Sequence, residues 1–263
     1  MPVIFFDIGA TLADARVEPD GSLTLLPRPR VIAVLDALGE VRKGVISNPG
    51  SGGGAVARAA AALHKAFPGR FTDVSLVHWG AKNDRGLFDQ AVASTGGVPA
   101  GDCVFVGEDP DERAFARQAG MRTAPHPVFV FAALEDRAVL RARIQVPDGR
   151  GLPELTAAMD ETEAVPDNAV SERLVLAMAT TRGAEALERG GFTVDLRGPV
   201  DGGAAAAGAN DDAERRATDK YVSDLLARGE AVFEGEEPTA RTTHVVKRED
   251  DGRLTVRRLR YFG

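Results

Sequence analysis

Residues 2–12 read Pro-Val-Ile-Phe-Phe-Asp-Ile-Gly-Ala-Thr-Leu, and this stretch decides how the first half of the chain folds. Its apolar run, residues 2–6, is continuous rather than alternating, and it ends at Asp7. Such a run is typical of a short strand that is buried on both faces of a parallel sheet. The sequence therefore predicts an internal strand that presents an acid at its carboxyl end.

Strand-like and helix-like segments alternate after this first strand. The predicted strands are residues 43–48, 74–77 and 103–107, and the predicted helices are residues 28–39, 55–67, 84–94 and 111–119. Because such alternation requires right-handed crossovers, we expect an α/β fold with a Rossmann-like parallel sheet covered by helices on both faces. Ligands bind outside the carboxyl ends of the strands in these sheets, so Asp7, Ser47 and Glu108 should meet at one edge.

Four short segments in this half of the chain carry the candidate chemistry. They are residues 5–12, residues 45–48 (Val-Ile-Ser-Asn), residues 80–82 (Gly-Ala-Lys) and residues 104–109 (Val-Phe-Val-Gly-Glu-Asp). In this order they resemble the four motifs of the haloacid-dehalogenase-like superfamily. The resemblance covers about residues 1–125 and implies a hydrolase core over that range.

The resemblance implies roles for five residues in catalysis and substrate binding. Asp7 would be the nucleophile that attacks phosphorus and forms an aspartyl-phosphate. Lys82 would balance the charge on the nucleophile and the phosphate. Thr11, Ser47 and Asn48 would bind the phosphoryl group, with Ser47 supplying a hydroxyl and its neighbour a backbone amide.

The metal ligands implied by the resemblance are Asp7, the backbone carbonyl of Gly9, Glu108 and Asp109, with Mg²⁺ as the cofactor. Two of these positions depart from the family pattern. Gly9 stands where the family has a second aspartate, so the side chain that protonates the leaving oxygen and activates water is missing. Glu108 stands where the family prefers Asp, and its extra methylene moves the carboxylate outward.

Arg113 stands five residues after Glu108, where the family often has another acid. One interpretation is that Asp109 and Asp111 complete the metal site. Another is that Arg113 pairs with Glu108 and replaces the cation. A third is structural: Glu108 and Asp109 only cap the following helix.

The pattern changes after residue 125. A strand, a helix, two strands, a helix and a last strand are predicted at residues 139–146, 152–161, 165–170, 174–179, 181–190 and 192–196. This βαββαβ order predicts a ferredoxin-like α+β domain over residues 126–200. The remainder, residues 201–263, is predicted to hold a Gly- and Ala-rich linker (202–210), a helix (213–228) and a basic hairpin pairing 244–246 with 254–256.

The spacing between the first two motifs bears on access to the site. Residues 13–40 have room for a hairpin over 16–26 and one helix, but not for a helical cap. An uncapped site suits a large substrate or a lid supplied by another domain. We therefore expect the ferredoxin-like domain to pack near the carboxyl edge of the parallel sheet.

Composition limits the partners. The 39 acidic and 32 basic residues give a net charge of −7, which argues against general affinity for nucleic acid or an anionic membrane. The basic hairpin lacks interleaved aromatic residues, so a solvated face is favoured over a nucleic-acid site. A single cysteine, Cys103, and the lack of a bilayer-length apolar run favour a cytoplasmic protein with no membrane partner.

Three hypotheses of function follow. The leading one is a phosphohydrolase that acts on a phosphorylated small molecule or protein through an Asp7 aspartyl-phosphate. One alternative is attack on carbon, as in a dehalogenase, where the second acid is normally absent. The other is a non-catalytic phosphate- or partner-binding protein, with a protein partner bound by the C-terminal half.

Overall fold

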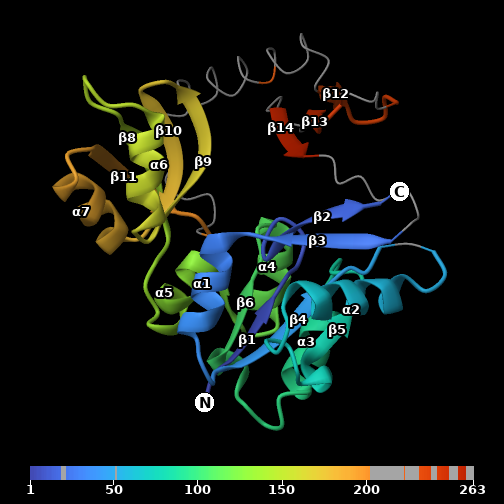
Figure 1. Cartoon of the computed structure of the whole chain (residues 1–263). Helices are drawn as coiled ribbons and strands as arrows, with labels where there is room; N and C mark the ends of the chain where they lie inside the picture. Colours follow the sequence, from blue (N-terminus) through green and yellow to red (C-terminus); the bar gives the residue numbers. More distant parts are fainter. Residues whose placement is uncertain are drawn as a thin grey trace. The chain divides into compact units, whose positions relative to one another are not determined.

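The computed structural model describes residues 1–18, 22–50, 52–201, 222, 231–237, 242–248 and 254–258. The chain divides into two compact units, Met1–Gly202 and Gly203–Gly263. The first unit contains both a parallel and an antiparallel sheet (Figure 1).

The parallel sheet has five strands in the order β5-β4-β1-β6-β7. Their bounds are β1 Val3–Phe6, β4 Arg42–Ser47, β5 Val77–Trp79, β6 Cys103–Val106 and β7 Arg122–Ala124. Every pairing in the sheet is parallel, and all four residues of the central β1 are buried. The predicted α/β fold with a Rossmann-like parallel sheet is confirmed.

Two apolar cores lie on opposite faces of this sheet. Ile4 and Phe6 belong to one core and Val3 and Phe5 to the other, because successive side chains of a strand point to opposite faces. The flanking helices are α1 Pro29–Ala37, α2 Ala55–Ala66, α3 Gly86–Ala93, α4 Pro110–Gln118 and α5 Val130–Leu134. Burial on both faces explains why the predicted strands appear as unbroken apolar runs.

One predicted strand is partly wrong, and one strand and one α-helix were not predicted. Residues 74–76 form a 3-10 turn, and β5 begins only at Val77. The reason is local: the Asp73 carboxylate accepts hydrogen bonds from the Ser75 amide and hydroxyl, which stabilises a turn. The short elements β7 and α5 were absent from the expectation.

The connection between β1 and β4 consists of a hairpin and a helix. The hairpin pairs β2 (Ala13–Val17) with β3 (Leu23–Pro27), and α1 follows directly. Residues 19–21, within the hairpin predicted over 16–26, lie outside the described residues. Within the described residues, the absence of a helical cap in this connection is confirmed.

The antiparallel sheet follows α5. Its elements are β8 Leu140–Gln145, α6 Leu152–Asp160, β9 Ala164–Ser171, β10 Leu174–Ala179, α7 Thr181–Arg189 and β11 Thr193–Pro199. The strand order is β11-β8-β10-β9, and every pairing is antiparallel. Alternate residues of β10 are buried, namely Val175, Ala177 and Ala179, and they share a core with both helices. The predicted order of elements is confirmed.

Polar contacts join the two sheets within the first unit. Arg30, on α1, donates to the backbone carbonyls of Thr162 and Ala164 at the start of β9. Arg137, in the segment before β8, pairs with Glu163. The chain after β11 returns to the parallel sheet through Asp201, whose contacts are described below.

The second unit contains a three-stranded sheet in the order β12-β13-β14. Its strands are β12 Ala231–Phe233, β13 His244–Arg248 and β14 Leu254–Arg258. The antiparallel pairing of β13 with β14 confirms the predicted hairpin, but residues 244–246 pair with residues 256–258 and not with 254–256. The parallel strand β12 was not predicted. The predicted linker, the hairpin turn and, apart from Val222, the predicted helix lie outside the described residues. No described helix has the length and apolar character to cross a bilayer.

Candidate functional site

Asp7 lies directly after the central strand, and only 1% of its surface is exposed. Its backbone N–H donates to the Val106 carbonyl at 2.8 Å, which extends the β1–β6 pairing by one residue. Its carboxylate oxygen Oδ1 accepts a hydrogen bond from Ser47 Oγ at 2.9 Å and lies 2.7 Å from Lys82 Nζ. The other oxygen, Oδ2, is buried and has no hydrogen-bond partner among the described residues.

The sheet explains why these three side chains meet. Ser47 ends β4, which neighbours β1, and the Gly80 amide donates to the Ser47 carbonyl at 3.1 Å. This bond holds the segment after β5 against the end of β4, so Lys82, two residues later, reaches Asp7. Residues predicted from three separate motifs are therefore brought together at the carboxyl edge.

Glu112 is a further member of the site that the sequence interpretation missed. Its Oε2 lies 2.6 Å from Lys82 Nζ, so one ammonium group bridges Asp7 and Glu112. Burial is the main cause that raises the pKa of Glu112 to about 7, opposed by the charge of Lys82 and reinforced by that of Asp7. The sequence feature that could have identified Glu112 is its position in the first turn of the helix that follows β6.

Thr11 and Asp109 support the backbone around the site. Thr11 is buried, and its hydroxyl accepts a hydrogen bond from the Glu108 amide at 3.3 Å. Asp109 is the N-cap of α4, and its Oδ1 accepts from the amides of Asp111 and Glu112. The capping role considered for Asp109 is thus present in the structure.

Asn48 is exposed, and its side chain accepts a hydrogen bond from the Gly50 amide at 3.0 Å. This contact forms a local turn at the start of the glycine-rich loop before α2. The predicted role of Asn48 in holding a phosphoryl group stays a prediction.

The loop after Asp7 carries a strained residue. Ala10 has φ of +56°, a left-handed conformation that is unfavourable for a residue with a Cβ atom. Arg28 donates to the Ala10 carbonyl at 3.2 Å and also pairs with Asp14, which holds the loop in this shape. Gly9 is not among the glycines with positive φ.

Arg113 does not replace a cation by pairing with the Glu108 carboxylate. Its guanidinium donates to the backbone carbonyls of Gly107 and Glu108 and forms its ion pair with Asp201. The interpretation that Arg113 pairs with the Glu108 carboxylate is therefore wrong, because the charge partner comes from a distant part of the chain.

The donor set for a metal ion is limited. Among the described residues, no group of three or more His, Cys, Asp or Glu side chains is arranged to hold a metal ion. Asp7, the Gly9 carbonyl and Glu108 are the groups that would hold a magnesium ion; the unpartnered Oδ2 of Asp7 fits such a ligand, whereas Glu108 is exposed. Asp109 fits less well, because its Oδ1 is occupied by two amides.

The sequence matches no protein-family model, and no curated protein matches it.

Proposed function

We propose that this chain is a phosphohydrolase of the haloacid-dehalogenase-like type, in which the Asp7 carboxylate attacks a phosphate ester. The observation that carries the proposal is the difference in partners between the two oxygens of that carboxylate. Oδ1 is held by Ser47 and Lys82, whereas Oδ2 is buried without a hydrogen-bond partner in the described structure. An unpaired buried carboxylate oxygen is costly, so its retention supports a role in which a ligand or substrate completes it.

The proposed reaction has two steps. In the first, a carboxylate oxygen of Asp7 forms a bond to phosphorus while the bond between phosphorus and the ester oxygen breaks, and the alcohol leaves with a proton from water. In the second, water attacks phosphorus and the bond between phosphorus and the Asp7 oxygen breaks, which releases phosphate and the free carboxylate. The proton lost by the attacking water neutralises the hydroxide that the first step leaves. Ser47 and Lys82 keep the nucleophile oriented throughout.

Magnesium, when bound, would neutralise the phosphoryl oxygens beside the nucleophile. Asp7, the Gly9 carbonyl and Glu108 are the groups that would hold it. The ammonium of Lys82, which lies between two carboxylates, balances the negative charge that remains on the protein side.

The arrangement of the antiparallel sheet supports two further parts of the proposal. If the four strands of this sheet are numbered 1 to 4 in chain order, they lie side by side in the order 4-1-3-2, and the chain path is βαββαβ. We assign this part of the chain to the ferredoxin-like class. Because the parallel domain has no inserted cap in its described connections, we propose that this sheet helps to cover the site. The substrate class is a phosphorylated small molecule or protein.

A non-catalytic phosphate-binding protein is the second candidate. The observation that favours it is Gly9, which leaves the loop after the nucleophile without an acid to assist proton transfer. Phosphate binding needs the Ser47 hydroxyl and the Lys82 charge, but it does not need that acid.

The decisive experiment combines turnover with trapping of the intermediate. The purified full chain is assayed with p-nitrophenyl phosphate and a panel of phosphate esters, with and without Mg²⁺. Denatured protein from the same reactions is tested for a base-labile, hydroxylamine-sensitive phosphoryl group. We expect Mg²⁺-dependent hydrolysis and such a label in the wild type.

Two variants complete the experiment, one without the nucleophile and one as a control. Asp7→Asn should lose the label and at least about 10³-fold in turnover, because the nucleophile is gone. Asp89→Asn removes an exposed carboxylate of α3 that pairs with Arg85, and it should leave both measurements unchanged. Phosphate binding without turnover or label in the wild type would support the non-catalytic candidate instead.

A further inference from the structure

A buried arginine supports the turn beside Asp7. Arg113, near the start of α4, is 2% exposed, and its Nη1 donates to the carbonyls of Gly107 at 2.8 Å and Glu108 at 2.7 Å. One guanidinium nitrogen thus binds the two successive residues that follow β6. A buried guanidinium requires a negative partner, so the position of this turn depends on what neutralises Arg113.

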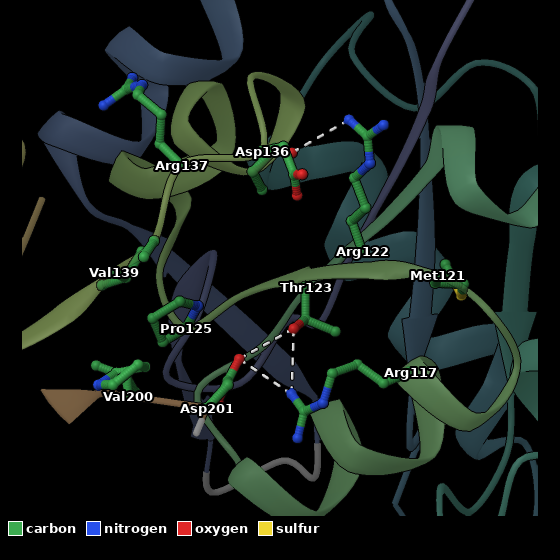
Figure 2. Close-up of a pocket in the computed structure, with 13 residues that line it drawn as sticks. Arg117, Met121, Arg122, Thr123, Pro125, Asp136, Arg137, Val139, Val200 and Asp201 are labelled. Carbon is green, nitrogen blue, oxygen red and sulfur yellow. Dashed lines mark hydrogen bonds and ion pairs between the residues drawn. The ribbon is translucent and has the colours of Figure 1, made fainter. Parts of the chain in front are cut away.

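The partner comes from the segment that follows the antiparallel sheet of the first unit. Asp201 follows β11, and its Oδ1 accepts from Arg113 Nε at 2.9 Å and lies 2.8 Å from Nη2. Its Oδ2 accepts from the Thr123 hydroxyl at 2.9 Å and lies 3.0 Å from Arg117 Nη1. Figure 2 shows Asp201, Thr123 and Arg117 directed toward one another. Both carboxylate oxygens are therefore engaged, and their partners are on α4 and β7.

The Gly107–Glu108 turn held by Arg113 contacts several segments around Asp7. The Gly107 amide donates to the Ala124 carbonyl at 3.1 Å, and the Glu108 amide donates to the Thr11 hydroxyl in the loop after Asp7. A Cβ atom on Gly107 would lie 2.8 Å from the Phe105 ring and 3.7 Å from the Asp7 Cβ. The turn is packed closely enough that a small displacement of it changes the site.

We propose that Asp201 is a positioning residue for the Asp7 site: by binding Arg113 it fixes the Gly107–Glu108 turn, and so makes the antiparallel sheet a determinant of activity in the parallel domain. The proposal rests on the proposed function. Glu108 is a candidate metal ligand, and an error of about 1 Å in such a group costs on the order of 10²-fold in rate. Asp201 acts through Arg113 and does not itself touch substrate.

The surroundings of Asp201 allow clean substitutions. Asp201 lies in the wall of a cavity of about 330 Å³, together with Thr123, Arg117 and Val200 (Figure 2). Asp201→Asn keeps the shape and removes the charge. Asp201→Glu keeps the charge, and the cavity gives the longer side chain room.

The test measures activity and local order in the same proteins. Asp201→Asn, Asp201→Glu and the wild type are compared in the full chain, with Asp195→Asn as the matched control. Asp195 is an exposed residue of β11 that pairs with Arg197, so Asp195→Asn removes one negative charge shortly before Asp201 in the chain without affecting Arg113. The measurements are kcat and KM for p-nitrophenyl phosphate, the Mg²⁺ concentration for half-maximal rate, the melting temperature, and amide hydrogen exchange of the peptide covering 103–113.

We expect Asp201→Asn to lower kcat by about tenfold or more with KM nearly unchanged, and to raise the Mg²⁺ requirement. Exchange should become faster at the amides of the 107–113 segment, while the rest of the parallel domain stays protected. Asp201→Glu should recover most of the activity and protection. Asp195→Asn should behave as the wild type.

Two results overturn the inference. One is an Asp201→Asn protein whose kcat and local exchange match the wild type. The other is a general loss of protection and melting temperature that Asp201→Glu does not reverse, since this indicates a merely structural contact. If the wild type hydrolyses no phosphate ester, the proposed function fails, and the exchange measurements alone decide whether Asp201 fixes the turn.

Discussion

Glu112 provides the sharpest test of how the site is built, because its burial has a measurable effect on folding. The pKa of its carboxyl is raised from 4.5 to about 7, with burial as the main cause. The neutral form is thus favoured in the folded protein, and ionisation is penalised. A change from 4.5 to about 7, at about 1.4 kcal/mol for each pH unit, corresponds to about 3 kcal/mol of folding free energy.

The direction of the pKa change determines how the stability depends on pH. Because the pKa is higher in the folded state than in the unfolded state, the stabilising contribution of the neutral carboxyl is complete below pH 4.5. It is lost as pH rises from 4.5 through about 7. Glu112→Gln, which mimics the neutral form, should therefore become more stable than the wild type as pH rises, by about 3 kcal/mol at pH 8.

The measurement is urea unfolding at several pH values between 5 and 8, in the presence of a chelator so that metal binding does not contribute. Glu185→Gln, at an exposed position on α7, controls for the loss of one negative charge. The quantity that matters is the difference in unfolding free energy between Glu112→Gln and the wild type. If that difference is the same at pH 5 and pH 8, the carboxyl does not titrate in this range and the reasoning is wrong.

Three further predictions concern single positions. Gly9→Asp should raise phosphatase turnover by about 10²–10⁴-fold in steady-state assays, because it restores an acid that transfers protons. Gly9 does not have positive φ, so the backbone accepts the aspartate. A folded, Mg²⁺-binding variant with no gain on any ester favours the non-catalytic candidate. Ala10→Gly should stabilise the chain by about 1 kcal/mol in urea unfolding, because it relieves the strain at φ +56°; a loss of stability contradicts this. Burial lowers the pKa of His126 to about 4, so its contribution to folding stability is lost as pH falls from 6.5 to 4. Over that range the wild type should therefore lose about 3 kcal/mol more unfolding free energy than His126→Asn, which keeps an acceptor for the Val128 amide; equal losses in the two proteins would refute it.

The elements predicted best from the sequence are the strands whose burial produces a continuous run of apolar residues. Strands β1 and β6 are buried at every residue, so they appear as continuous apolar runs. Strand β7 was missed because Arg122 and Thr123 give it no such run, and only Ala124 of its three residues is buried. Its position depends on pairing with β6, which is a tertiary contact.

The candidate site divides in the same way. Asp7, Ser47 and Lys82 were grouped from the sequence because parallel strands place their carboxyl ends at one edge. Glu112 was missed because its role depends on how the first turn of α4 faces Lys82. The contact of Arg113 with Asp201 joins residues 88 positions apart, and no local pattern marks either residue as the partner of the other.

Asp7 and Glu112 together indicate that the site is maintained at a cost to stability. The carboxyl groups of Asp7 and Glu112 share the ammonium of Lys82, and Oδ2 of Asp7 is left without a partner in the described structure. A protein that only needed a stable core would fill these positions with apolar side chains, since replacing buried ionic groups in this way is often neutral or stabilising. The nearby left-handed Ala10 adds strain to the same loop. Unfavourable features concentrated around one carboxylate are expected where that carboxylate binds or attacks a ligand, and they support the proposal that Asp7 does so.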